Sequence, residues 1–125
     1  MSVQSKLILC VDDNGFLLDS LQKYLTSKGF RVIACSDGEM ALMLLSSGPV
    51  DAVVVDYEMP NMNGGELAQR LVTKYPHLRV LYMSGYSDDA VEHRGVFAAD
   101  SAFLQKPFST RALMQKIREV LDSGK

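Results

Sequence analysis

The sequence predicts an α/β fold in which a doubly wound, five-stranded parallel sheet carries helices on both faces. Five short apolar runs alternate with longer stretches in which apolar residues recur at three- and four-residue spacing. The runs are nearly continuous in aliphatic and β-branched residues, as in parallel strands that are covered on both faces. Because alternating strands and helices imply right-handed crossovers, we expect a parallel, doubly wound sheet. We expect the strand order 2-1-3-4-5 of such sheets, in which the first and third strands lie side by side.

The elements follow in order along the chain. The predicted strands are the apolar runs Lys6–Val11, Phe30–Ala34, Asp51–Val55, Arg79–Met83 and Ala102–Gln105. The predicted helices carry apolar faces at Leu17, Leu18, Leu21 and Leu25, at Ala41, Leu44 and Leu45, at Leu67, Leu71 and Val72, and at Leu113, Ile117, Val120 and Leu121. The fourth helix, which would begin at Ser87 and end at Gly95, has the weakest pattern.

Helix-boundary residues occur where this scheme needs them. Two pairs have the spacing of a capping box, Ser36 with Glu39 and Asn63 with Glu66. The residues expected at further N-caps are Ser87 and Ser109, and the expected helix stops are Gly29 and Gly48-Pro49.

Length and composition predict a single domain over residues 1–125, with a core over about 5–122. The 13 basic and 15 acidic residues give a net charge of −2 without a basic run, which disfavours direct binding of nucleic acid. No apolar stretch is long enough to span a bilayer and no signal peptide is recognisable, so we expect a cytoplasmic protein. Cys10 and Cys35 are expected to be buried free thiols, and His77 and His93 to be surface residues.

Polar residues stand at the ends of four of the predicted strands. Asp12 and Asp13 follow the first strand, Asp56 the third, Ser84 the fourth and Lys106 the fifth. Because the carboxyl ends of parallel strands meet at one edge of a sheet, these five side chains should converge there. The alternative, three unrelated loop or N-cap aspartates, does not explain why serine and lysine occupy the matching strand ends.

The residue types at this edge favour phosphoryl chemistry with a divalent cation. Two like charges about 4 Å apart repel by about 4 kcal/mol at an effective dielectric constant near 20, so clustered carboxylates recruit a cation or a proton. An all-oxygen site suits Mg²⁺, whose coordination phosphate oxygens often complete. One oxygen of Asp56 would then attack phosphorus, while the Lys106 ammonium and the Ser84 hydroxyl bind phosphoryl oxygens.

Four motifs give the chain a resemblance to a known family. They are Val11-Asp12-Asp13-Asn14, Val55-Asp56-Tyr57-Glu58-Met59-Pro60-Asn61-Met62-Asn63-Gly64, Met83-Ser84-Gly85-Tyr86 and Gln105-Lys106-Pro107-Phe108. In this order and spacing they resemble the response-regulator receiver domain of bacterial two-component signalling, a flavodoxin-like fold, over essentially the full chain.

The resemblance implies roles for individual residues. Asp56 would be the phosphoacceptor, and Asp13, Asp56 and the backbone carbonyl of Glu58 would hold Mg²⁺, with Asp12 acting through a water molecule. Ser84 and Lys106 would contact the phosphoryl group, and the Lys106-Pro107 bond would be cis. A second set of implied roles covers Phe103 as a switch residue with Ser84, and Glu58 and Tyr86 as residues that set the phosphoryl lifetime. Two alternatives stay open: Phe103 is only a packed core residue, and Glu58 and Tyr86 have no effect on the phosphoryl lifetime.

The resemblance also implies partners. The phosphoryl donor would be a phosphohistidine on a sensor histidine kinase or a histidine phosphotransfer protein. A downstream protein or a second copy would bind the face made by the fourth helix, fifth strand and fifth helix. The chain would not be an enzyme in the usual sense, because it would catalyse only its own phosphorylation and dephosphorylation. Both a free-standing domain and the C-terminal receiver of a hybrid histidine kinase fit the sequence.

Two other functions share part of this pattern. A small phosphatase of the haloacid dehalogenase type also combines a nucleophilic aspartate, a serine or threonine and a lysine around Mg²⁺, but its nucleophile follows the first strand. A phosphorylation-independent binding module would not need the full set of acceptor-site residues that this chain carries.

Overall fold

The computed structural model describes residues 6–48, 50–59, 62, 64–85 and 102–122. The strands are β1 (Leu7–Val11), β2 (Arg31–Cys35), β3 (Ala52–Asp56), β4 (Arg79–Ser84) and β5 (Ala102–Gln105). The helices are α1 (Gly15–Ser27), α2 (Gly38–Leu44) with the short 3₁₀ helix η2 (Leu45–Ser47), α3 (Gly64–Lys74) and α5 (Thr110–Asp122). The predicted fourth helix, with Ser87 and His93, lies outside the described residues.

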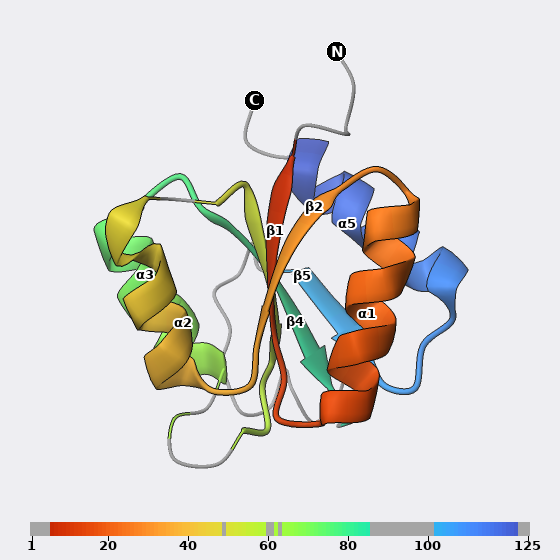
Figure 1. Cartoon of the computed structure of the whole chain (residues 1–125), viewed down its shortest axis with the longest axis horizontal. Helices are drawn as coiled ribbons and strands as arrows, with labels where there is room; N and C mark the ends of the chain where they lie inside the picture. Colours follow the sequence, from red (N-terminus) through yellow and green to blue (C-terminus); the bar gives the residue numbers. More distant parts are fainter. Residues whose placement is uncertain (1–5, 49, 60–61, 63, 86–101, 123–125) are drawn as a thin grey trace.

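The five strands form one parallel sheet in the order β2-β1-β3-β4-β5, which confirms the predicted topology. The first strand, β1, pairs with β2 on one side and β3 on the other, so that Leu9 lies level with Ile33 and Val53. Figure 1 shows α1 and α5 on one face of this sheet and α2 and α3 on the other.

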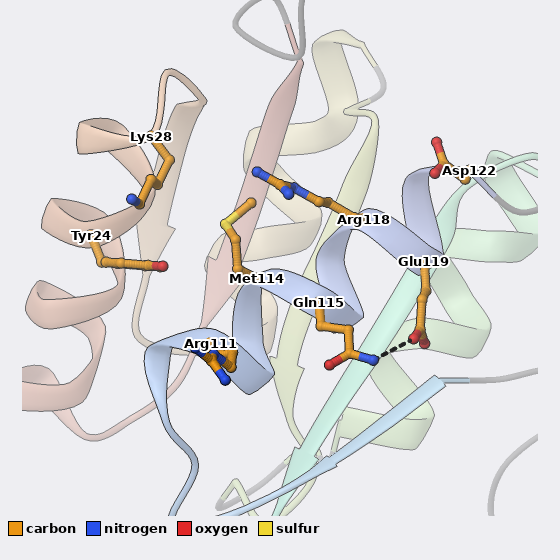
Figure 2. Close-up of a pocket in the computed structure, with 8 residues that line it drawn as sticks. All are labelled: Tyr24, Lys28, Arg111, Met114, Gln115, Arg118, Glu119 and Asp122. Atoms are coloured by element: carbon orange, nitrogen blue, oxygen red, sulfur yellow. Dashed lines mark hydrogen bonds between the residues drawn. The ribbon is translucent and has the colours of Figure 1, made fainter.

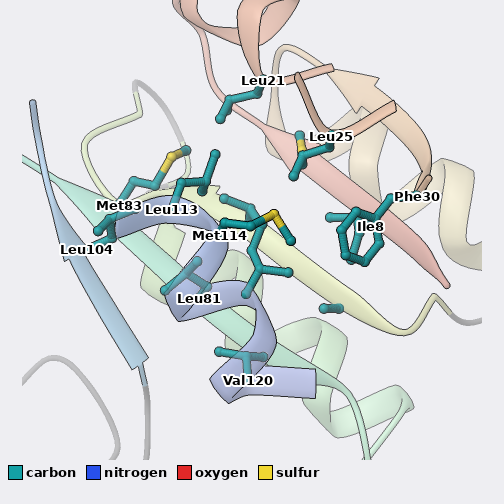
Figure 3. Close-up of a cluster of buried hydrophobic side chains, with 14 of the residues drawn as sticks. Ile8, Leu21, Leu25, Phe30, Leu81, Met83, Leu104, Leu113, Met114 and Val120 are labelled. Atoms are coloured by element: carbon teal, nitrogen blue, oxygen red, sulfur yellow. The ribbon is translucent and has the colours of Figure 1, made fainter. Parts of the chain in front are cut away.

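Alternate residues of each strand enter two separate cores, because successive side chains of a strand point to opposite faces. Ile8 and Cys10 of β1 pack toward α1 and α5, in the cluster drawn in Figure 3. Leu9 and Val11 of the same strand pack toward α2 and α3. The two cores explain why the interior of each strand sequence is apolar without alternation.

The second strand begins one residue later than the sequence suggests, and the turn before it explains why. Gly29 adopts a positive φ of 96°, a conformation that favours glycine, and ends α1 as predicted. The amide of Phe30 then donates back to the Leu25 carbonyl at 3.2 Å, so Phe30 still belongs to the turn. The Arg31 amide donates to the Lys6 carbonyl at 3.0 Å and begins the ladder with the first strand.

The helix caps confirm one prediction and correct another. Ser109 caps α5, because its hydroxyl oxygen accepts the Ala112 amide at 3.0 Å. The capping box predicted at Ser36 and Glu39 is wrong, because the N-cap of α2 is Asp37, whose Oδ1 accepts the Met40 amide at 2.7 Å. Aspartate is as good an N-cap as serine, so residue type does not distinguish Ser36 from Asp37, and the backbone conformation determines which of them caps the helix. The predicted cap Asn63 lies outside the described residues.

Both cysteines are free and buried, as predicted. Cys10 belongs to the core under α1 and α5, whereas Cys35 belongs to the core under α2 and α3. A disulfide between them would have to pass through the sheet, so the fold keeps both as thiols. Within the described part of the chain, no helix has the length and apolar character that crossing a membrane requires.

Candidate functional site

The carboxyl edge of the sheet collects the polar residues that the sequence singled out. Asp12 and Asp13 follow β1 directly, Asp56 is the last residue of β3, and Ser84 is the last residue of β4. Lys106 follows β5, and its amide donates to the Ser84 carbonyl at 2.7 Å. The strand register therefore brings these five residues to one edge.

Three carboxylates and one ammonium form what we call the aspartate half of the site, made of Asp12, Asp13, Asp56 and Lys106. The three carboxylates each offer an oxygen atom within 4.8 Å of the others. Asp12 and Asp56 are 0% and 3% exposed, whereas Asp13 is exposed to solvent. The Lys106 Nζ lies 3.0 Å from Asp12 Oδ2 and 3.2 Å from Asp56 Oδ1.

Local contacts fix Asp12 within this half. Its Oδ2 binds Lys106, and its Oδ1 accepts the amide of Asn14 at 2.8 Å. Asn14 in turn begins α1, because its Oδ1 accepts the Leu17 amide at 3.1 Å. Asn14 is a residue to which the sequence assigned no role, although an asparagine just before a helical pattern is a recognised N-cap signal.

The charges of the aspartate half are unbalanced. Burial, and then the negative charge of Asp12, raise the pKa of Asp56 above its ordinary value, although Lys106 opposes the shift. Burial alone would lower the pKa of Lys106, but its hydrogen bond to Asp12 and the charges of Asp12 and Asp56 raise it overall. Three ionised carboxylates facing one ammonium leave two negative charges, which a divalent cation would neutralise.

A second group of residues lies beside these, and we call Glu58, Ser84 and Gly85 the glutamate half. The Ser84 hydroxyl donates to Glu58 Oε2, and the Gly85 amide donates to Glu58 Oε1 at 3.0 Å. The Glu58 amide reaches the other half, since it donates to Asp56 Oδ1 at 3.3 Å. The sequence placed these residues at the edge but did not reveal that the Glu58 side chain binds Ser84.

Gly64 supports the site from behind, a role that the sequence analysis missed. A Cβ atom at Gly64 would lie 2.5 Å from the Asp56 carbonyl oxygen and 2.9 Å from the Tyr57 Cα. The Gly64 amide donates to the Tyr57 carbonyl at 3.0 Å. The start of α3 therefore lies directly against the backbone that carries Asp56, a distance that only glycine permits. A glycine at the first position of a helix was the available signal.

The remaining predicted residues are placed as follows. Phe103 in β5 is half-buried and packs against the core under α2 and α3. The Lys106-Pro107 bond is cis, as the resemblance implies. Tyr86 lies outside the described residues, so its predicted role stays a prediction.

A shallow pocket of about 480 Å³ lies elsewhere, between α1 and α5. Figure 2 shows its lining, which comes from Tyr24, Lys28, Arg111, Met114, Gln115, Arg118, Glu119 and Asp122. None of these residues belongs to either half of the site. The chemistry of the strand ends is therefore separate from this pocket.

Comparison with known proteins decides which family shares this arrangement. A family model described as the response regulator receiver domain matches residues 8–118. The chain belongs to this family. This receiver domain has its aspartates, serine and lysine on the strand ends that the sequence analysis named.

Curated relatives of the receiver domain are longer proteins. It is 38% identical over 112 residues to the response regulator protein FleR of Pseudomonas aeruginosa, covering 88% of this chain and 23% of FleR. It is 32% identical over 120 residues to the sensor kinase CckA of Brucella abortus, covering 94% of this chain and 13% of CckA. The chain thus spans a minor part of these relatives.

Solved structures agree with the fold. A response regulator receiver protein from Sinorhizobium medicae superposes with a TM-score of 0.85 at 31% identity, covering 98% of both chains. The response regulator TrrA of Thermotoga maritima, in complex with Mg²⁺-BeF, superposes with a TM-score of 0.82 at 29% identity, covering 94% of this chain and all of that one (100%).

Proposed function

We propose that this receiver domain is a phosphoacceptor switch in which Asp56 takes a phosphoryl group from a phosphohistidine. The observation that carries the proposal is the aspartate half, where three carboxylates offer oxygen atoms within 4.8 Å and Lys106 lies 3.2 Å from Asp56. Burial of Asp56 at 3% exposure keeps bulk water away from the reacting oxygen.

Mg²⁺ is the cation that fits this half. All candidate ligands are oxygens, as Mg²⁺ prefers, and the two uncompensated negative charges match its charge. We assign Asp13, Asp56 and the backbone carbonyl of Glu58 as its ligands, with Asp12 acting through a water molecule. When bound, the ion would supply positive charge beside the phosphoryl oxygens, which otherwise repel the Asp56 carboxylate.

The residues of the chain divide the reaction between them. An Asp56 oxygen forms a bond to phosphorus while the phosphorus–nitrogen bond of the donor breaks, and its electron pair returns to the imidazole. The Lys106 ammonium, already held by Asp12 and Asp56, lies where it stabilises negative charge on the transferred group. The product is an aspartyl phosphate, which water later hydrolyses to release inorganic phosphate.

In this role the domain is a partner of other proteins rather than an enzyme on small substrates. It catalyses only its own phosphorylation and dephosphorylation. The donor is a sensor histidine kinase or a histidine phosphotransfer protein. Rearrangement of Ser84 and Phe103 would pass the signal to the face that includes β5 and α5, where a downstream protein or a second copy binds.

The direct experiment is to incubate the protein with acetyl phosphate and Mg²⁺ and to measure its intact mass. We expect the wild type to gain the mass of one phosphoryl group, and Asp56→Asn and a chelator-treated sample to gain none. Asp19→Asn, an exposed aspartate on α1, is the matched control and should react like the wild type. An equal gain in Asp56→Asn would refute the assignment, and repeated turnover of added phosphate esters would indicate a phosphatase.

A further inference from the structure

The Glu58 carboxylate occupies two hydrogen-bond donors at the edge of the site. One oxygen accepts the Ser84 hydroxyl, and the other accepts the Gly85 amide at 3.0 Å. The two donors come from consecutive residues at the end of β4, whereas Glu58 follows β3. Both oxygens of the carboxylate therefore bind the end of β4, and Glu58 links this end to the end of β3.

The backbone holds Glu58 in position for this contact. Asp56 and Met83 are paired in the sheet, and the Tyr57 amide donates to the Met83 carbonyl at 2.8 Å. The Glu58 amide donates to Asp56 Oδ1 at 3.3 Å. The main chain of Glu58 is thus tied to the acceptor aspartate, while its side chain is tied to Ser84 and Gly85.

A carboxylate and a phosphoryl group present the same chemistry to such donors. Each offers negatively charged oxygens, and charge-assisted hydrogen bonds to such oxygens are the stronger kind. A phosphoryl group on Asp56 would need donors at this edge, and a hydroxyl and an amide are the neutral donors that the end of β4 supplies. In the unphosphorylated domain these two donors are already occupied by Glu58.

We infer that Glu58 is a positioning residue that acts as an internal competitor, because its carboxylate takes the place of phosphoryl oxygens on Ser84 and Gly85 until Asp56 is modified. The inference rests on the proposed role of Asp56. It concerns the unphosphorylated domain, and so differs from the lifetime role that the family resemblance implies for Glu58. Acceptance of the phosphoryl group requires the Glu58 side chain to leave, which lets the Ser84 hydroxyl move to the new anion.

The surroundings of Glu58 favour such a movement. Glu58 is exposed, so its side chain leaves toward solvent and no cavity forms behind it. Ser84 is fully buried at 0% exposure, so its hydroxyl needs an acceptor at all times. The Glu58 carboxylate accepts this hydroxyl before phosphorylation, and the phosphoryl group on Asp56 accepts it afterwards.

The first test uses the protein without any phosphoryl group. Amide exchange at Gly85, followed by NMR, should be about tenfold faster in Glu58→Ala than in the wild type, because the acceptor of that amide is lost. Glu66→Ala is the matched control, since Glu66 is an exposed glutamate that pairs with Arg70 on α3. Gly85 exchange that is equal in all three proteins would overturn the inference.

The second test measures the affinity for beryllium fluoride in the presence of Mg²⁺, as an analogue of the phosphoryl group. We expect Glu58→Ala to bind about tenfold more tightly than the wild type, and Glu58→Gln about threefold, since the neutral amide keeps only one acceptor oxygen. In a Ser84→Ala background the gain from Glu58→Ala should shrink, because one of the contested donors is gone.

The outcomes separate the two proposals. If wild type and variants bind beryllium fluoride equally, Glu58 does not compete and the inference is wrong, while the role of Asp56 stands. If no protein binds beryllium fluoride or takes a phosphoryl group, the proposed function fails. The Gly85 exchange measurement still decides whether the Glu58 contact exists.

Discussion

In the aspartate half of the site, three carboxylates share one ammonium, whereas in the glutamate half the Glu58 carboxylate is held by two neutral donors. Asp12 and Asp56 are buried and carry uncompensated charge. Glu58 is exposed, and its hydrogen bonds to Ser84 and Gly85 need no cation. The aspartate half needs a cation or a proton to balance its negative charge. In the glutamate half, another acceptor can replace Glu58 at a small cost in free energy.

One edge of the sheet thus combines a fixed reaction centre with an adjustable neighbour. Asp56 is the last residue of β3 and pairs with Met83, and the amide of Asp12, directly after β1, donates to the Cys35 carbonyl, so that neighbouring strands hold both backbones. Glu58 comes from the connection between β3 and α3, and only its side chain reaches β4. Substitutions should therefore disturb stability and metal binding in the aspartate half, and the switching equilibrium in the glutamate half.

The largest effect should follow the loss of the ammonium in the aspartate half. Lys106→Met leaves Asp12 and Asp56 buried without their cation, so we expect the free energy of unfolding to fall by about 3 kcal/mol without metal. Lys116→Met, which removes an exposed partner of Glu119, should change it by about 0.5 kcal/mol or less. Urea denaturation in the presence of a chelator measures both values, and equal losses would show that Lys106 is an ordinary surface lysine.

A smaller effect should come from the glycine behind Asp56. Gly64→Ala forces a methyl group against the Asp56 carbonyl, and we expect a loss of stability of about 2 kcal/mol together with slower phosphorylation by acetyl phosphate. Gly38→Ala is the control, because its methyl group would meet the sulfur of Met62 at 2.8 Å, on a side chain that can shift. If thermal unfolding and phosphorylation rate change equally in both variants, the position of Asp56 does not depend on the approach of α3.

Magnesium binding should distinguish the two halves. We expect Asp13→Asn to weaken Mg²⁺ binding by about tenfold, or 1.4 kcal/mol, because a charged ligand becomes neutral. Glu58→Gln should weaken it by at most about threefold, since only the backbone carbonyl of that residue is assigned to the ion. Isothermal titration gives both constants. A greater loss in Glu58→Gln than in Asp13→Asn would mean that the ion lies in the glutamate half.

The smallest effect concerns the thiols beneath the aspartate half. Burial raises the pKa of Cys35 to about 11 and that of Cys10 to about 12, from an ordinary value of 9.0. Because the fold prefers the neutral thiols, the stability that they contribute is complete below pH 9, and it is lost as the pH rises through about 11 for Cys35 and about 12 for Cys10.

At pH 8 we therefore expect both thiols to react slowly with a disulfide reagent in the native protein and rapidly in urea. The Cys35 carbonyl accepts the Asp12 amide at 3.3 Å, so Lys106→Met should speed the reaction slightly and Ser84→Ala should not. A faster reaction in Ser84→Ala than in Lys106→Met would contradict the separation of the two halves.

The two halves also differ in how far the sequence predicted them. The parallel sheet and the edge positions of Asp12, Asp56 and Lys106 follow from apolar runs and the residues that end them, because the carboxyl ends of parallel strands lie at one edge. The Glu58 contact to Ser84 depends on the path of a connection and on one rotamer, and neither leaves a periodic pattern. For the same reason the capping-box spacing predicted Ser36 as the cap of α2, whereas the hydrogen bonds of the folded chain make Asp37 the cap.

The sequence did not predict the close approach of Gly64 to the backbone of Asp56 either. A glycine at the start of a helix is common, and only the packing of α3 against the strand end shows that its missing Cβ matters. The free thiols were predictable, because apolar strand runs place cysteines inside the sheet.

The most direct measurement is a crystal structure of the domain with Mg²⁺ and beryllium fluoride. It should show beryllium on an Asp56 oxygen, Mg²⁺ bound by Asp13 and Asp56, and Lys106 in contact with a fluorine atom. Beryllium fluoride on another carboxylate, or an ion that Asp13 and Asp56 do not touch, would contradict the account.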